Sequence, residues 1–518
     1  MSAATEHRPV VWSVAGSDSG GGAGLQADLR AFEAFGVHGC SVVAAITAQN
    51  SVAVSRAEAV AADLVDAQLE ALAEDLFPAA LKTGLLGSAD NARRVAAQTD
   101  TLRRRAALAL VVDPVRRATT GATFADAALR EVYRDALLPR ATVLTPNRDE
   151  AAWLLGMSRL DDDTSVAQAA RALRERGAGA VVITGGDAGG SESRDFAATP
   201  QAEGWLVQRR IATPHHHGSG CTFAAAIAAA LALGFCEADA IVLGKLAAAQ
   251  GLRRAGPAGA GAGPVRPDTR FAAERADFPV WLDTLDAWRP AAAFAPTGSA
   301  PLGLYAIVDS AAAVERVARA GVPTVQLRIK QADAGTLAAE VACAVAAARR
   351  HGVRLFVNDH WALALQHGAY GVHLGQTDLA GADPAALHAA GLRVGISTHA
   401  PWEVARALAW RPSYIACGPV FPTPTKRMPW APQGAHNLRY WSARLDVPLV
   451  AIGGLDVPRA ALAAGCGADG VAVLRGIAGA PDVPAAVAAY RGAIASAPAA
   501  PGPAPLRPLP TLAAGGTA

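Results

Sequence analysis

The sequence has no long apolar run and almost no excess of charge of either sign. No uninterrupted run of about 18 strongly apolar residues occurs, so no membrane-spanning helix is expected. The start of the chain lacks the charged and apolar regions of a secretory signal peptide, so a cytoplasmic location is expected. The 47 basic residues are opposed by 45 acidic ones, and the net charge of +2 gives no electrostatic footprint for nucleic acid.

Cysteine and lysine are both scarce. The six cysteines include no CxxC pair, which argues against a disulfide framework or structural zinc site and favours reduced thiols. Only four lysines occur, at 82, 245, 330 and 426, and arginine supplies the remaining positive charge. Each lysine is therefore a candidate for a particular role.

Two common nucleotide-binding motifs are also missing. The sequence has no GxxxxGK[ST] motif, and its glycine cluster GSDSGGGAG (16–24) does not fit GxGxxG. These absences disfavour a P-loop NTPase and a Rossmann dehydrogenase.

The composition is that of a folded chain with two large parts. Apolar residues make up 52% of the 518 residues and charged residues 18%, which is ample for buried cores. Stretches 256–267 and 289–302 are rich in Pro, Gly and Ala, as flexible connections are. We predict domains at 1–285 and 303–492, a linker at 286–302, and a disordered tail at 493–518.

The first part alternates strands with helices at uneven spacing. Strands are predicted at 10–16, 39–46, 79–86, 107–113, 141–145, 180–184 and 204–211, and a long Ala-rich helix near 221. This order indicates an open, mostly parallel sheet with helices on both faces.

The second part contains eight short apolar runs, at 304–309, 324–329, 354–359, 371–375, 393–397, 414–420, 449–454 and 470–475. Their spacing of about 24 residues suits a compact (β/α)₈ barrel, although an open eight-stranded sheet would give the same periodicity. Polar residues favour the barrel, because they collect where the strands end and barrel strands converge at one mouth. They are Asp309, Arg328, Lys330, Asn358, Asp359, Gln376, Asp378, Ser397, Lys426, Gly454 and Arg475.

In the first part, small residues lead directly into the Ala-rich helix. Gly218, Ser219 and Gly220 precede Cys221, and unpaired N–H groups at 219–222 would form an anion site with the helix dipole. The same field is expected to lower the pKa of the Cys221 thiol. A plain helix cap with a small buried thiol is the alternative, and the neighbouring histidines 215–217 are interpreted as a chance cluster rather than a metal site.

Further motifs follow the predicted strands. TPNRDEA (145–151) supplies Asn147 and Glu150, which suit water-mediated Mg²⁺ binding, and VVDPV (111–115) ends a strand in a carboxylate. With AGSDSGGGAGLQADL (15–29), AITAQNSV (45–52) and KTGLLG (82–87), they resemble the hydroxymethylpyrimidine/phosphomethylpyrimidine kinases over nearly all of 10–270. The resemblance implies a ribokinase-like three-layer αβα domain that uses Mg-ATP to phosphorylate 4-amino-5-hydroxymethyl-2-methylpyrimidine and then its monophosphate.

The resemblance also assigns residues. It places Gly16, Asp28, Gln49 and Val115 on the pyrimidine side, and Asn147, Glu150, Thr184 and Gly186 on the nucleotide side. It makes Gly218, Ser219 and Gly220 an anion hole, and puts Cys221 where sugar kinases have a catalytic Asp. Thr184 stands where the family usually has Lys, and we expect Arg116 or Arg117 to replace part of that charge.

The barrel motifs are QLRIK (326–330), VNDH (357–360), HLGQTD (373–378), GIS (395–397), GPVFPTPTK (418–426) and IGG (452–454). Two carboxylates at neighbouring strand ends, with Arg and Lys nearby, suit Mg²⁺ bound to a diphosphate. The set resembles thiamine-phosphate synthase over almost all of 303–480. That family joins a pyrimidine methyl diphosphate to a thiazole phosphate and releases pyrophosphate.

On this resemblance, Asp359 and Asp378 hold Mg²⁺, and Ser397 lies at the reacting centre and also contacts substrate. The pyrimidine diphosphate is assigned to Gln326, Arg328, Lys330, Asn358 and Lys426, and the thiazole phosphate to Thr423, Thr425, Gly454, Leu474 and Arg475. The sequence departs from the usual pattern at Ile329, His360 and the Leu474–Arg475 pair. We expect Arg475 to strengthen phosphate binding, since arginine matches phosphate bidentately.

The product of the first reaction is the substrate of the second, so a bifunctional thiamine biosynthesis enzyme is predicted. Its expected partners are small molecules only, with neither nucleic acid nor membrane, and a homo-oligomer is compatible with the sequence. Two alternatives stay open: an active kinase joined to a catalytically dead, ligand-binding or regulatory barrel, and a pyridoxal-type kinase in the first part.

Overall fold

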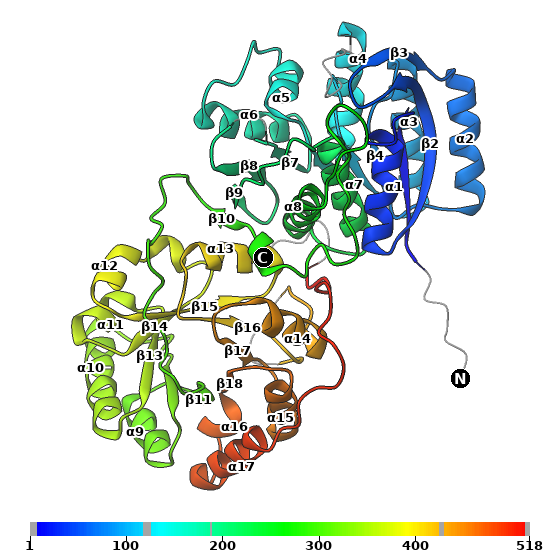
Figure 1. The fold of residues 1–518 in the computed structure, drawn as a ribbon. Coiled ribbons are helices and arrows are strands. Elements are labelled where there is room, and N and C mark those ends of the chain that lie inside the picture. Colours follow the sequence, from blue (N-terminus) through cyan, green and yellow to red (C-terminus); the bar gives the residue numbers. More distant parts are fainter. Residues whose placement is uncertain (1–7, 118–125, 187–188, 424–428, 513–518) are drawn as a thin grey trace, which may run out of the picture. The chain divides into compact units, whose positions relative to one another are not determined.

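The computed structural model describes residues 8–117, 126–186, 189–423 and 429–512 (Figure 1). Two compact units follow each other along the chain, with the boundary between Leu285 and Asp286. The helices of the described ranges include none with the length and apolarity needed to cross a membrane.

Unit 1 is built on one ten-stranded sheet, in the order β10-β9-β8-β7-β6-β5-β4-β1-β2-β3. The central strands pair in parallel, while β3 at one edge and β8 to β10 at the other are antiparallel. The strands are β1 Val10–Asp18, β2 His38–Gln49, β3 Val54–Ala59, β4 Ala80–Thr83, β5 Ala109–Val112, β6 Val143–Leu144, β7 Ala180–Ile183, β8 Glu192–Ala198, β9 Glu203–Arg209 and β10 Val280–Leu282.

Helices cover both faces of this sheet. Helices α1, α7 and α8 pack together on one face, and α2 to α6 lie on the other (Figure 1). Their bounds are α1 Gly24–Phe35, α2 Ala62–Asp75, α3 Ala89–Arg103, α4 Ala127–Val132, α5 Arg148–Leu155, α6 Asp163–Glu175, α7 Ser219–Ala232 and α8 Glu237–Arg253. The alanines of α7 are buried on all sides, because small side chains let α8 and the sheet approach this helix closely.

The predicted three-layer αβα architecture is confirmed, and each predicted strand of this unit is present. Sequence reading missed β3, β8 and β10, which have weak strand signals. Strand β3 is almost wholly exposed at the sheet edge, β8 begins with four polar residues, and β10 has only three residues. An edge strand with one exposed face carries little apolar alternation for a pattern to detect.

Unit 2 is a closed barrel of eight parallel strands, β11 to β18 in sequence order, so the barrel prediction is confirmed over the open sheet. The strands are β11 Gly303–Val308, β12 Thr324–Leu327, β13 Arg354–Asn358, β14 Gly371–Leu374, β15 Arg393–Thr398, β16 Tyr414–Cys417, β17 Leu449–Ile452 and β18 Gly470–Val473. The helices are α9 Ala311–Arg319, α10 Ala334–His351, α11 Trp361–His367, α12 Pro384–Ala389, α13 Pro401–Ala409, α14 Gly434–Arg444, α15 Val457–Gly465, α16 Arg475–Ala478 and α17 Val483–Ala495.

The segment predicted as a linker, 286–302, lies across the amino ends of the barrel strands. The Phe294 N–H donates to the Arg411 carbonyl (3.0 Å), and the Ser413 hydroxyl donates to the Ala295 carbonyl (2.6 Å). Arg354, at the start of β13, donates to the carbonyls of residues 297 and 300–302. The Phe294 ring is buried against Trp410. This segment therefore closes the end of the barrel opposite the strand termini that carry the predicted site.

The segment after α17, predicted as a disordered tail, follows the surface of α14 in its described part. Arg439 donates to the Gly502 and Pro503 carbonyls (2.7 and 2.8 Å). The Asn437 side chain both donates to the Leu509 carbonyl and accepts from the Leu509 N–H (3.0 and 2.7 Å). This Pro-rich segment has few large apolar side chains that could pack against α14. It is bound mainly by hydrogen bonds from side chains of α14 to its backbone carbonyls.

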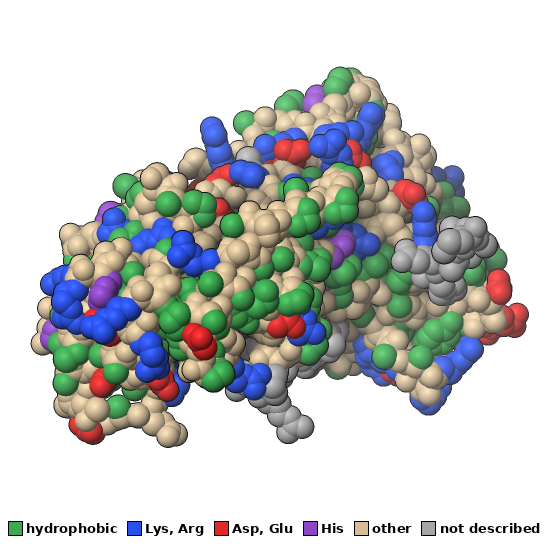
Figure 2. Space-filling view, turned by 90° about the horizontal axis from the view of Figure 1, so that it is seen from below, with side chains coloured by type: hydrophobic (Ala, Val, Ile, Leu, Met, Phe, Trp, Pro, Cys, Tyr) green, Lys and Arg blue, Asp and Glu red, His purple; other side chains and the backbone are tan. Residues whose placement is uncertain are grey.

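Basic and acidic side chains are interspersed on the molecular face seen in Figure 2. This mixture is what the near equality of basic and acidic residues predicts.

Candidate active sites

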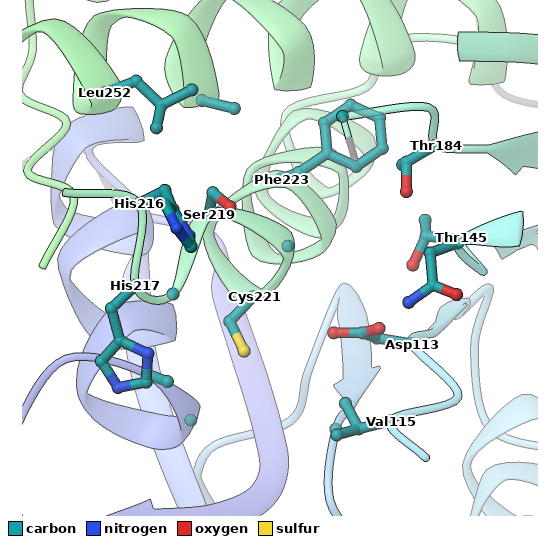
Figure 3. Close-up of a pocket in the computed structure, with 18 of the residues that line it drawn as sticks. Asp113, Val115, Thr145, Thr184, His216, His217, Ser219, Cys221, Phe223 and Leu252 are labelled. Carbon is teal, nitrogen blue, oxygen red and sulfur yellow. The ribbon is translucent and has the colours of Figure 1, made fainter. Parts of the chain in front are cut away.

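The first cavity lies in unit 1 at the carboxyl ends of the central parallel strands and at the start of α7 (Figure 3). Its volume is about 560 Å³. The structure brings together all but one of the residues predicted for the kinase site: Gly16, Gln49, Val115, Asn147, Glu150, Thr184, Gly186, Gly218, Ser219, Gly220 and Cys221. The exception is Asp28, which does not line the cavity.

The start of α7 is shaped by close backbone packing. Gly218 has φ +81°, and a Cβ at this position would lie 2.1 Å from the Gly22 carbonyl oxygen, so only glycine fits. The Ser219 N–H bonds to the His216 carbonyl (3.2 Å), and the Thr222 N–H to the Gly218 carbonyl (2.9 Å). The prediction of unpaired N–H groups throughout 219–222 is therefore wrong for these two.

Cys221 points into the cavity from the first turn of α7, between His217 and Asp113 (Figure 3). Burial raises the pKa of its thiol to about 12, although the Lys82 ammonium acts in the opposite direction. The expected lowering of this pKa is wrong, because loss of hydration outweighs the effects of the Lys82 ammonium and the Gly24 N–H. At neutral pH the side chain is therefore a protonated thiol.

A buried charged cluster lies at this part of the cavity, and two of its members, Lys82 and Asp113, line the cavity wall. The Lys82 Nζ lies 3.0 Å from both carboxylate oxygens of Asp28 and 3.6 Å from Asp113, and the Lys82 and Asp28 side chains are fully buried. The Ser13 hydroxyl also donates to Asp28 (2.6 Å). Burial raises the pKa of Asp113 to about 6, against the effect of Lys82. Asp28 therefore holds Lys82, a lining residue, and does not itself line the cavity.

The glycine-rich loop after β1 is organised by Asp18. Its carboxylate accepts from the N–H groups of Gly20, Gly22 and Ala23 (2.8, 2.9 and 2.8 Å) and from His217 Nε2 (3.0 Å). Burial would raise the pKa of Asp18, but His217 and the N–H groups lower it below its usual value. Sequence reading missed the contact of Asp18 with His217, which are 199 residues apart in the chain.

Gln49 contacts the same histidine. Its side-chain amide lies 3.2 Å from His217 Nε2. His217 therefore lines the cavity on the same side as Gln49. Among the residues that the structure describes, no group of three or more potential metal ligands occurs.

The predicted nucleotide side contains a capping box at the start of α5. The Asn147 side chain accepts from the Glu150 N–H (2.8 Å), and Glu150 accepts from the Asn147 N–H (2.9 Å). Glu150 also accepts from the Arg116 N–H (3.3 Å). These contacts fix both side chains at the cavity wall.

Lys245 supplies a cation that the sequence-based assignment overlooked. It extends from α8 into the same cavity and donates to Asp195 (2.6 Å), which in turn accepts from the Gly185 N–H (3.0 Å). In the sequence, only the rarity of lysine pointed to a particular role for Lys245. Arg117 also lines the cavity, whereas the Arg116 guanidinium lies over the Trp153 ring at 6.0 Å.

The second cavity, of about 810 Å³, lies in unit 2 at the carboxyl ends of the barrel strands. The predicted residues that line it are Gln326, Arg328, Lys330, Asn358, Asp359, Asp378, Ser397, Thr423, Gly454, Leu474 and Arg475. Two further predicted residues, Thr425 and Lys426, lie outside the described residues. Asp309, at the end of the first barrel strand, is not among the lining residues.

The two predicted metal ligands lie side by side. The carboxyl groups of Asp359 and Asp378 are hydrogen-bonded to each other, and Lys330 donates to Asp359 (2.5 Å). Burial and the neighbouring Asp359 raise the pKa of Asp378. Burial would also raise the pKa of Asp359, but Lys330 lowers it below its usual value. Two adjacent carboxyl groups of this kind are a donor set that a divalent cation fits.

Ser397 is connected to the barrel interior rather than only to the cavity. Its hydroxyl lies 2.8 Å from His373 Nε2, and Nδ1 of the same ring lies 2.7 Å from the Tyr414 hydroxyl. Burial lowers the pKa of His373 to about 4, and Arg328 acts in the same direction. The ring is therefore neutral at physiological pH. Sequence reading quoted the motif that contains His373 but assigned the histidine no role.

The loop at 453–454 approaches the Pro-rich loop after β16. Gly454 has φ +68°, and a Cβ there would lie 2.7 Å from the Pro422 carbonyl oxygen. His399, Glu403 and Trp430 form another wall that the assignment missed. Glu403 accepts from His399 Nδ1 (2.8 Å), and the rings of His399 and Trp430 stack at 4.1 Å.

The two folds and cavities define a two-domain enzyme of phosphorylated substrates, with an αβα kinase domain followed by a TIM-barrel transferase. Residues 18–266 match the family described as phosphomethylpyrimidine kinase, and residues 304–477 match the family described as thiamine monophosphate synthase. The chain belongs to both families and is a bifunctional thiamine biosynthesis enzyme.

Relatives cover nearly the whole chain. A probable thiamine biosynthetic bifunctional enzyme, chloroplastic, of Oryza sativa subsp. japonica is 32% identical over 87% of this chain and 82% of its own length. A thiamine-phosphate synthase of Serratia proteamaculans is 53% identical over 36% of this chain and 89% of its own. A pyridoxal kinase from Staphylococcus aureus, solved with ADP, is 32% identical over 50% of this chain and 93% of its own, with a TM-score of 0.46.

Proposed function

We propose that unit 1 transfers phosphoryl groups from Mg-ATP to 4-amino-5-hydroxymethyl-2-methylpyrimidine and then to its monophosphate. We further propose that unit 2 couples the resulting diphosphate to thiazole phosphate, giving thiamine phosphate and pyrophosphate. The observation that supports both steps is the convergence of the predicted residues on one cavity in each unit.

In unit 1, the pyrimidine would lie beside Gln49 and Val115, and the nucleotide beside Thr184, Gly186 and Lys245. Phosphoryl transfer needs chiefly alignment and charge neutralisation. The start of α7 supports this role, because N–H groups and the helix dipole favour a developing negative charge there. Cys221 acts as a neutral thiol that contacts the reacting group, since its raised pKa disfavours a thiolate.

In unit 2, Asp359 and Asp378 would hold Mg²⁺, which when bound neutralises diphosphate charge. Arg328 and Lys330 bind the diphosphate from the adjacent strand end. Departure of pyrophosphate leaves a cation stabilised by the pyrimidine, so the main task of the site is to stabilise the leaving anion. Thr423, Gly454, Leu474 and Arg475 would receive the thiazole phosphate from the other side of the barrel mouth.

The test uses the purified full chain with pyrimidine monophosphate, Mg-ATP and thiazole phosphate. Thiamine phosphate is expected to form. Cys221→Ala is expected to abolish diphosphate formation, whereas Asp378→Ala is expected to let pyrimidine diphosphate accumulate. Cys343→Ala, at an exposed cysteine of α10, is the matched control.

Two results would contradict the proposal. Absence of thiamine phosphate when pyrimidine diphosphate is supplied directly would mean that the barrel does not catalyse coupling. Pyridoxal competing more strongly than the pyrimidine monophosphate in the kinase assay would assign unit 1 to pyridoxal instead.

A further inference from the structure

Five polar side chains form one continuous hydrogen-bonded chain through the barrel interior. The Gln326 amide donates to the Tyr305 hydroxyl (3.3 Å), and the Tyr305 and Tyr414 hydroxyls lie 2.8 Å apart. Tyr414 is 2.7 Å from His373 Nδ1, and His373 Nε2 is 2.8 Å from the Ser397 hydroxyl. This series of hydrogen bonds thus crosses the barrel from β12 to β15.

The two tyrosines of this hydrogen-bonded chain are closed to solvent, while the other three members reach the cavity. Tyr305 and Tyr414 are 1% and 0% exposed, and His373 is 4% exposed. Gln326, His373 and Ser397 line the cavity. Inside a barrel core a polar hydrogen has no water to bond, so each hydrogen of the chain must be used by the next member.

The donor at one end fixes the direction of every bond. Because the Gln326 nitrogen can only donate, the Tyr305 oxygen accepts from it, and the Tyr305 hydrogen is directed to Tyr414. The Tyr414 hydrogen is then directed to His373 Nδ1. Because Nδ1 of His373 accepts this hydrogen, the ring carries its own hydrogen on Nε2 and donates it to Ser397.

We propose that Tyr305, Tyr414 and His373 are positioning residues that leave the Ser397 hydroxyl free to donate its own hydrogen into the cavity, toward the departing pyrophosphate. This inference rests on the proposed coupling function. With the opposite direction, Ser397 would donate to His373 and present only lone pairs to the cavity. A pyrophosphate group offers acceptors, so the first direction is complementary to it and the second is not.

The first experiment measures whether Tyr414 acts through Ser397. The inhibition constant for inorganic pyrophosphate and the kcat of coupling are determined for wild type, Tyr414→Phe, Ser397→Ala and the double variant. Tyr414→Phe is expected to weaken pyrophosphate inhibition and kcat by about tenfold, as loss of one hydrogen bond to a charged group does. In the Ser397→Ala background, the same change is expected to have less than about a twofold effect.

Matched variants separate positioning from a general packing effect. Tyr440→Phe removes a hydroxyl from another fully buried tyrosine of the same barrel, on α14, and should leave pyrophosphate inhibition unchanged. Tyr305→Phe interrupts the chain one step further from Ser397 and should weaken pyrophosphate inhibition less than Tyr414→Phe does, because Tyr414 can still donate to His373 Nδ1. If Tyr414→Phe does not fold, the NMR experiment below still tests the proposal on the wild type.

The second experiment observes the hydrogen on His373 directly. Nitrogen-15 NMR of the histidine rings in the full chain, with the His373 signals assigned from a His373→Asn variant, should show hydrogen on Nε2 and none on Nδ1. A hydrogen on Nδ1 would overturn the proposal. So would equal effects of Tyr414→Phe with and without Ser397. If the wild type forms no thiamine phosphate from pyrimidine diphosphate, the proposed coupling function is wrong. The NMR result then still shows in which direction the hydrogen bonds from Gln326 to Ser397 run.

Discussion

Replacement of Lys82 by methionine tests the buried charged cluster at the wall of the kinase cavity. Lys82 is fully buried, and its ammonium lies 3.0 Å from the Asp28 carboxylate, which is itself fully buried. Lys82→Met leaves that carboxylate without its cation. Removing one partner of a buried ion pair typically costs about 3–5 kcal/mol, because the remaining charge is neither hydrated nor paired.

Hydrogen–deuterium exchange measures this loss within the intact chain. Since about 1.4 kcal/mol corresponds to a tenfold change, amides of β1 and β4 should exchange roughly 140- to 4,000-fold faster in Lys82→Met. Amides of the barrel strands should keep their rates and serve as an internal control. The double variant Lys82→Met/Asp28→Asn, which removes the unpaired charge as well, should recover part of the protection.

The result that would refute this reasoning is a small effect. A loss below about 1 kcal/mol for Lys82→Met would mean that Asp28 carries little charge in the folded protein. A double variant as unstable as the single one would mean that lost packing, and not the unpaired carboxylate, accounts for the change.

Three further outcomes are expected. Alkylation of Cys221, followed by peptide mass spectrometry, should accelerate about tenfold per pH unit from pH 7 to 10, because its pKa is raised to about 12; a plateau near neutral pH would contradict this. Deletion of residues 500–518 should destabilise the barrel by about 1–3 kcal/mol in urea, since several hydrogen bonds to α14 are lost; an unchanged midpoint would show that the segment contributes nothing. Gly454→Ala should raise the KM for thiazole phosphate at least severalfold, because a side chain would strike the Pro422 carbonyl; Gly352→Ala, at a helix end with open space, is the control for left-handed strain.

The barrel could be predicted almost completely from the sequence, since each of its strands is a short apolar run ending in polar residues. The convergence of its polar strand-end residues on one cavity could be predicted as well, because strand ends of a closed barrel must share one mouth. The hydrogen-bonded chain through Tyr305 and Tyr414 could not. These two tyrosines are 109 residues apart and look like ordinary core residues in a strand pattern.

The kinase site shows where reading from local patterns fails. Cys221 was placed correctly at the helix start, yet the direction of its pKa shift depends on burial by distant segments. Asp28 lies on α1 after a glycine-rich stretch but points to Lys82 on β4. Lys245 belongs to an Ala-rich helix, and only the fold reveals that this helix borders the cavity. The burial of a residue and the charged groups around it depend on how the layers of the fold pack together. The spacing of motifs in the sequence does not reveal this packing.

The contact between α14 and the segment after α17 consists mainly of helix side chains that bond to the segment's backbone oxygens. His436, Arg439 and Arg444 bond to backbone oxygens at 502, 503, 505 and 507. Backbone oxygens are the same whichever amino acid carries them. Mutations in this stretch should therefore be tolerated as long as the chain keeps its extended course, whereas changes in the helix donors should release it. Substitutions are therefore expected to accumulate among residues 502–507 and to be rare at the three donor side chains of α14.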